Sequence, residues 1–177
     1  MIEPMLARPD SLLNLFRYKA WANTELFELI GNISFEAFPE QWTTAVRLLN
    51  HTLVVDQIFA AHLQGRAHAF EATNTVETPC LKVLQTSVQT SDQWFIHYVS
   101  ELNPGTLKAN VTFEFTDGDA GSMTREEILN HLVIHSTYHR GNIGMLLNAC
   151  GLDRPKDTLT RFLHAFEPSR RTEAGHS

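Results

Sequence analysis

The longest helical segment that the sequence predicts, residues 125–150, carries three histidines spaced four residues apart: His131, His135 and His139. Residues four apart on a helix lie on one face, with Cβ atoms about 5–6 Å apart. Two imidazoles at that spacing can bind one divalent metal ion. Because a HxxxH pair alone is a weak signal, a metal site and a metal-free face of hydrogen-bonded core histidines both remain open on spacing alone.

The composition favours one compact domain with a sizeable core. The chain has 177 residues, of which 43% are hydrophobic, and a chain of this length buries roughly 70% of its unfolded surface. We therefore expect a single domain over residues 1–177, with an ordered core over about 10–167 and a disordered tail over 168–177. The net charge of −6 and the lack of a Lys/Arg cluster outside Arg170-Arg171 argue against nucleic acid as a partner.

No segment of the sequence is typical of a membrane protein or of a secreted one. No apolar run approaches the ~20 residues of a membrane span, and residues 1–10 lack the apolar stretch of a signal peptide. We expect a cytoplasmic protein with no membrane partner. Cys80 and Cys150 lie far apart and form no CxxC pair, so we expect free thiols rather than a disulfide.

Apolar residues at three- and four-residue spacing predict four long amphipathic helices. The first helix is expected from Asp10, a candidate N-cap, to Gly31, and the second from Thr43 or Thr44 to Gly65. The third is expected from about Leu81 to Leu102, and the fourth from Arg125 to Cys150. Residues 66–79 lack this periodicity and predict a loop.

Shorter elements are expected around the last long helix. Residues 111–115 alternate between apolar and polar side chains before Asp117-Gly118, which predicts a short hairpin or an extended crossing segment. Thr124 and Glu127 form the pattern of a capping box. Asp157 is a candidate cap for a short C-terminal helix that ends near Phe166.

Four such helices predict an all-α fold, a four-helix bundle in which metal ligands project from facing helices. In the last long helix, His135 and His139 follow the spacing of the core-facing residues, whereas His131 is rotated off that face. In the second helix, His51 and His62 share one face and compete as the third ligand. They are three turns, about 16 Å, apart, so both cannot bind one ion.

Several motifs resemble those of the DinB family. The main one is HLVIHSTYHRGNI over residues 131–143, and YKAWAN over 18–23 and LLNH over 48–51 agree with it in the family's order, as do Asp157 and Phe162. The resemblance covers most of the chain. It implies a bundle with an up-down-down-up connection, frequent homodimers, and a metal held by one histidine of the second helix and a HxxxH pair.

By motif position, the resemblance assigns the metal to His51, His135 and His139. Asn142 stands where the family usually has Gln, and Phe59 where it often has Trp, and neither is a predicted ligand. Ser136 follows His135, so the motif is not HExxH and offers no Glu base of the metalloprotease kind. Metalloprotease chemistry is therefore disfavoured.

Three imidazoles leave an open position on a divalent ion, where a bound thiol or water has a lowered pKa. We expect a metal-dependent thiol S-transferase or a hydrolase that uses a small-molecule substrate such as a low-molecular-weight thiol. The alternatives are a non-catalytic metal-binding stress or structural protein, which predicts a closed coordination sphere, and a metal-free bundle. Zinc or nickel is the expected ion, with iron or manganese also compatible.

No residue is assigned a catalytic role from the sequence. Tyr138, Arg140 and Asn142 are candidates to orient a substrate. Each also has a structural interpretation: Tyr138 as packing at the boundary of the core, Arg140 in an ion pair, and Asn142 as a hydrogen-bond partner of a metal ligand. Because protons compete with a metal for imidazole, metal affinity is expected to drop below about pH 6.5.

Overall fold

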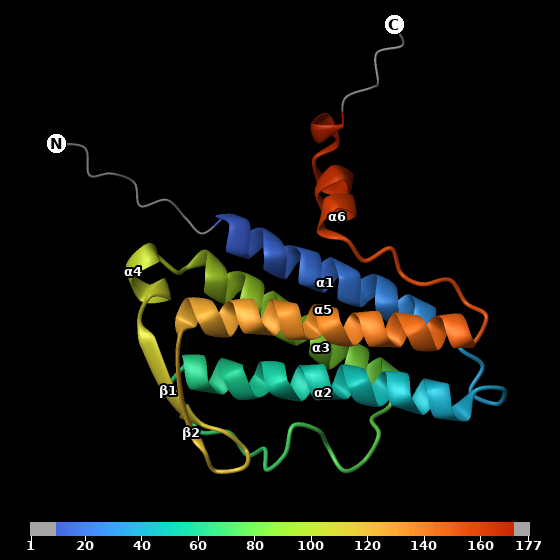
Figure 1. The fold of residues 1–177 in the computed structure, drawn as a ribbon, viewed down its shortest axis with the longest axis horizontal. Helices are drawn as coiled ribbons and strands as arrows, with labels where there is room; N and C mark the ends of the chain where they lie inside the picture. Colours follow the sequence, from blue (N-terminus) through green and yellow to red (C-terminus); the bar gives the residue numbers. More distant parts are fainter. Residues whose placement is uncertain (1–9, 172–177) are drawn as a thin grey trace, which may run out of the picture.

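Four long helices make up most of the protein, as Figure 1 shows for the computed structural model, which describes residues 10–171. The helices are α1 (Asp10–Ile30), α2 (Pro39–Leu63), α3 (Leu81–Ser100) and α5 (Arg125–Ala149). The shorter elements are α4 (Pro104–Leu107), β1 (Asn110–Glu114), β2 (Ala120–Thr124), α6 (Leu159–Phe166) and a 3-10 turn (Pro168–Arg170). The expected predominance of helix is confirmed.

The four long helices lie side by side with the apolar core between them. Helix α1 packs mainly against α3 and α5, and α2 packs mainly against the same two helices. In Figure 1, α1 and α5 run in one direction and α2 and α3 in the other. Fully buried residues such as Phe16, Phe95 and Leu132 fill one half of the core, and Leu26 and Ile143 belong to the other half. None of the described helices is long and apolar enough to cross a membrane.

Helix α2 begins at Pro39, earlier than the predicted start at Thr43 or Thr44. Proline suits the first turn of a helix because its fixed φ is already helical and its missing N–H is not needed there. The helix ends as expected, with Gly65 in the left-handed region at φ +64°. Helix α1 begins at Asp10 itself, and any residue that caps it lies outside the described part of the chain.

The segment between α3 and α5 is a β-hairpin, the first of the two predicted alternatives. Strands β1 and β2 pair antiparallel, with Phe113 opposite Gly121. Before them, Asn103 caps the short helix α4, which the sequence analysis did not anticipate. The predicted capping box at the start of α5 is confirmed, because Thr124 accepts a hydrogen bond from Glu127 N–H and the Glu127 carboxylate accepts one from Thr124 N–H.

The C-terminal helix α6 is present, but its predicted cap is wrong. Thr158, rather than Asp157, accepts the capping hydrogen bond from Arg161 N–H. Asp157 instead bonds to Arg140 and Tyr18, so its carboxylate is engaged elsewhere. The predicted tail over residues 168–177 starts with the 3-10 turn, and residues 172–177 lie outside the described part.

Candidate metal centre

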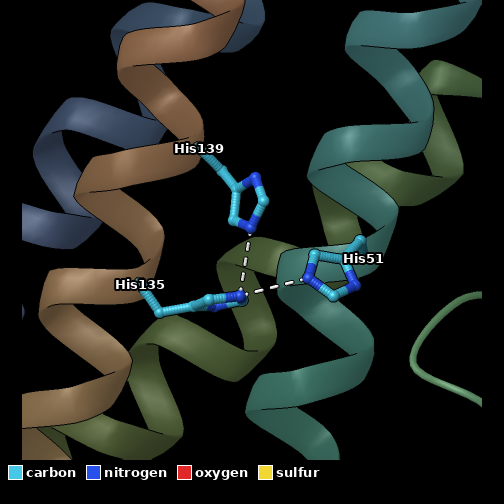
Figure 2. A group of neighbouring side chains, drawn as sticks. All are labelled: His51, His135 and His139. Atoms are coloured by element: carbon cyan, nitrogen blue, oxygen red, sulfur yellow. Dashed lines mark hydrogen bonds between the residues drawn. The ribbon is translucent and has the colours of Figure 1, made fainter.

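Three histidines from two helices meet between α2 and α5. Figure 2 shows His51 of α2 facing His135 and His139 of α5. The Nε2 atom of His135 lies 3.1 Å from Nε2 of His51 and 3.1 Å from Nε2 of His139. One nitrogen from each ring lies within 4.8 Å of the other two. The structure thus brings together the three residues that the sequence analysis proposed as ligands.

The spacing of these nitrogens suits a metal ion. Two nitrogens that each lie 2.0–2.1 Å from a tetrahedral ion are about 3.3 Å apart, close to the separations around His135. Hydrogen bonds alone cannot satisfy the group, because a neutral imidazole carries one N–H and His135 Nε2 has two nitrogen neighbours. The donor set therefore fits a divalent ion.

His51 is oriented by a backbone group. Its Nδ1 lies 2.7 Å from the carbonyl oxygen of Thr73. A carbonyl only accepts hydrogen bonds, so this contact places the proton on Nδ1 and leaves Nε2 free to bind a metal. A metal-binding histidine typically donates its second N–H in this way.

Side chains of α2 hold the Thr73 segment in place. The buried Asn50 amide donates to Asn74 Oδ1 at 2.5 Å and to Thr75 Oγ1 at 2.6 Å. Arg47 donates to the carbonyl oxygen of Thr75 at 3.0 Å. Asn50 directly precedes His51, so α2 carries both the ligand and the residue that positions its hydrogen-bond acceptor.

Burial keeps the imidazoles of α5 neutral. Burial, with a smaller contribution from His139 and His51, lowers the pKa of His135 to about 3. Burial and the neighbouring His51 also lower the pKa of His139. Because a metal binds the neutral form of imidazole, both residues remain available as ligands at a lower pH than a free imidazole would.

The predicted core face of α5 needs a correction. Ile128, Leu132 and Ile143 are fully buried, as expected, but Leu146 is only half-buried. The buried face continues instead through Ser136, Arg140, Gly144 and Leu147. His135 and His139 therefore lie at the edge of this face, where they are half-buried.

The other two histidines considered for this site lie elsewhere. The ring of His131 stacks on that of His135 at 5.4 Å between centroids and meets Phe59 edge-on. His62 contacts His68 and Phe113. Neither belongs to the group of converging nitrogens, which among the described residues contains three histidines and no Cys, Asp or Glu.

The three residues proposed to orient a substrate differ in exposure. Tyr138 is 66% exposed, and its ring lies 5.1 Å from that of His139. Arg140 is 1% exposed and donates to Asp157 at 2.6 Å and to Ser136 at 2.7 Å. It is thus in an ion pair, and a buried one. Asn142 is half-buried, and its proposed role stays a prediction.

A buried charge network that the sequence analysis missed lies between α1, α2 and α3. Lys19 donates to Asp56 at 2.6 Å and to Asp92 at 2.7 Å, and Asn23 donates to Asp92 at 2.8 Å. Burial alone would lower the pKa of Lys19, but the two neighbouring carboxylates raise it. Asp56 is thereby a partner of Lys19 and not a metal ligand.

A helical protein with three histidines converging between two helices has the features of a metal-binding protein. The sequence matches the model of the DinB family over residues 5–172. The chain therefore belongs to the DinB family. It is also similar to protein DinB of Bacillus subtilis (strain 168), with 23% identity over 157 residues, 80% of this chain and 87% of that protein. No solved structure is significantly similar to the chain.

Proposed function

We propose that the protein is a metal-dependent enzyme that binds one divalent ion through His51, His135 and His139. The observation that carries the proposal is the convergence of three imidazole nitrogens, 3.1 Å apart in two of the pairs. The Thr73 carbonyl supports it by fixing the proton of His51 on the nitrogen that faces away from the group. Membership of a family whose members generally bind metals agrees with it.

When bound, the ion supplies a Lewis acid that lowers the pKa of a coordinated thiol or water. The protein provides three neutral ligands, and the open position on the ion is where a substrate would bind. Tyr138 lies beside His139 at the surface, where its hydroxyl can donate a hydrogen bond to a substrate. We propose thiol S-transfer or hydrolysis as the reaction, with a low-molecular-weight thiol as the first substrate to test and zinc or nickel as the ion.

The helix directions in Figure 1 support a four-helix bundle with the up-down-down-up connection. We propose this topology together with a homodimer and a cytoplasmic location. The outer face of α5 exposes Ile134 and Met145, which lie on one side of the helix, and a second copy would cover these apolar side chains. Light scattering at tens of micromolar protein tests the dimer, and a mass near the 20.1 kDa of one chain would contradict it.

Metal content of single variants tests the ligand set. Replacing His51, His135 or His139 by Ala removes one of three ligands and should lower metal affinity by more than the 10- to 100-fold that loss of a supporting residue costs. His131→Ala and His62→Ala are matched controls and should retain the metal. Loss of metal in His131→Ala together with retention in His139→Ala would show that the ligand pair lies one turn earlier.

Turnover separates an enzyme from a non-catalytic metal protein. Metal-loaded and metal-stripped protein are compared with small thiols and electrophilic acceptors, and with ester and amide substrates. Turnover that requires the metal and is lost in His139→Ala supports the enzyme. Metal binding without turnover, together with a metal-dependent rise in the unfolding temperature, would favour a metal that only stabilises the fold.

A further inference from the structure

A pocket with a volume of about 600 Å³ lies between α6 and the long helices α1 and α3. In Figure 1, α6 lies outside the four long helices and beside α1, on which it packs. The histidine group belongs to the other two long helices, α2 and α5. No residue of that group lines the pocket, so the pocket is separate from the proposed metal centre.

Helical spacing brings the lining residues of this pocket together. On α1, Arg17 and Trp21 are four residues apart, so their side chains lie on one face of the helix. On α6, Phe162 and Phe166 are also four residues apart and share a face. Ile96 of α3 closes the apolar part of the wall. Three helices thus turn one face each toward the same space.

The apolar wall is largely aromatic, and its rings are held in place. The Trp21 ring lies 5.8 Å from that of Phe162, and the guanidinium of Arg161 lies 4.9 Å over it. Glu25 binds Arg161 at 2.7 Å. The Phe166 ring lies 4.6 Å from that of Phe162 but is 63% exposed. A ring of a ligand would gain by covering this exposed aromatic surface.

The pocket is lined by one acidic and one basic side chain, and only the acidic one is paired. Glu167 binds Arg170 at 2.6 Å. Arg17 is exposed and forms no ion pair within residues 10–171. The guanidinium presents its N–H donors in a planar fork that matches the two oxygens of a carboxylate. The ligand charge that complements this pocket is therefore negative.

We infer that this pocket binds a small aromatic carboxylic acid. Its ring packs against Trp21 and Phe166, and its carboxylate pairs with Arg17. The volume and the combination of aromatic walls with a few polar groups are those of a small-molecule site, since such pockets measure about 300–1,000 Å³. The inference does not depend on the proposed metal centre, with which the pocket shares no residue.

Three naphthalene compounds of nearly the same shape test the role of charge. They are naphthalene-2-carboxylate, the neutral naphthalene-2-carboxamide and the cationic 2-naphthylmethylammonium. Isothermal titration calorimetry measures their affinities for metal-stripped protein, so that the carboxylate cannot bind through a metal. The carboxylate should bind about fivefold more tightly than the amide, as expected for an exposed ion pair, and the ammonium should bind least tightly. The preference for the carboxylate should shrink as salt is added.

Arg17→Gln and Phe166→Ala separate the charged contribution from the apolar one. Arg17→Gln should lower the affinity for the carboxylate to that for the amide. Arg66→Gln is the matched control and should bind as the unmodified protein does, because Arg66 is also exposed and without an ion pair within residues 10–171. Phe166→Ala should weaken binding of all three compounds about fivefold. Phe35→Ala removes a 55% exposed ring that packs on Trp42, outside the pocket, and should not weaken binding.

The contrary results are distinct. Equal affinities for the carboxylate and the amide, or an Arg17→Gln variant that matches Arg66→Gln, would show that the pocket does not recognise an acid. Binding that is unchanged in Phe166→Ala would place the ligand elsewhere on the protein. Absence of binding by all three compounds would also overturn the inference. If Phe166→Ala then converts a dimer to the 20.1 kDa mass of one chain in light scattering, a second copy of the chain covers the pocket instead.

Discussion

Helix α5 carries polar side chains on two faces, and the faces differ in whether those side chains have protein partners. On the core side, Arg140 is 1% exposed and bonds to Asp157, Ser136 and Thr137. On the side that faces α2, the ring nitrogens of the adjacent His139 meet another imidazole or no partner at all among the described residues. His139 and Arg140 are thus adjacent in sequence, but only Arg140 is hydrogen-bonded to partners that belong to the fold.

The presence or absence of protein partners distinguishes a polar side chain that stabilises the fold from one that binds a ligand. A buried charge is tolerated where it is paired and hydrogen-bonded, as for Arg140 and for Lys19, even though Asp56 Oδ1 has no partner among the described residues. Buried imidazoles without partners cost free energy unless something else binds them. The partnered buried charges should therefore contribute to stability, and the imidazoles without protein partners should contribute to metal binding.

Lys19→Met should give the largest effect on stability. It leaves two buried carboxylates without their ammonium partner, and breaking a buried ion pair in this way costs about 3–5 kcal/mol. Urea unfolding followed by far-ultraviolet circular dichroism measures the loss, and metal affinity of the folded protein should stay unchanged. Lys82→Met, at an exposed position of α3, is the control. Equal stability of the two variants would mean that the network stabilises nothing.

Asp157→Ala should destabilise the protein by about 2–3 kcal/mol, because Arg140 loses a charged hydrogen-bond partner while it remains buried. Tyr18, which also donates to Asp157, loses its acceptor. The same unfolding experiment measures the effect. Asp153→Ala lies in the same connection at an exposed position and should change the free energy of unfolding by less than about 0.5 kcal/mol. A metal-binding defect in Asp157→Ala would contradict the separation of the two faces.

Asn50→Ala should weaken metal binding by about 10- to 100-fold, since it releases the segment whose carbonyl orients His51. Competition with a coloured chelator measures the affinity. Asn148→Ala removes an exposed amide near the end of α5 and serves as the control. If Asn50→Ala binds metal as well as that control does, the Thr73 contact does not position the ligand.

The local parts of this picture were predictable from the sequence. The pairing of His135 with His139 follows from helical spacing, and the capping box at Thr124 and Glu127 follows from a four-residue pattern. The helical spacing made His51 and His62 equally good candidates for the third ligand, and the resemblance to the DinB family favoured His51. The structure places His51, and not His62, with the other two histidines. Metal binding itself stays a prediction.

The missed features depend on contacts between distant segments. Lys19, Asp56 and Asp92 come from three helices, and each looks like an ordinary surface charge in its own helix. Thr73 acts through its backbone carbonyl, which leaves no signal in the side-chain sequence. The need for glycine at position 121 is evident only once the hairpin places the Phe113 ring over it.

The smallest expected effect is a dependence of stability on pH through His135. A free imidazole protonates near pH 6.5, but the pKa of His135 in the folded protein is lowered to about 3, chiefly by burial. Between these values the unfolded chain binds a proton that the folded, metal-free protein does not. Stability from this group is therefore complete above pH 6.5 and declines as the pH falls toward 3.

The decline should be less than about 1.4 kcal/mol per pH unit, the slope for one full proton, because His135 is only half-buried and solvent screens part of the effect. Urea unfolding of metal-free protein at several pH values between 4 and 7 measures it, and His135→Asn should have a shallower slope. The same shift means that protons displace the metal from His135 only below the pH expected for free imidazole. A slope in the unmodified protein that is no steeper than in His135→Asn would show that His135 is as easily protonated as an exposed histidine.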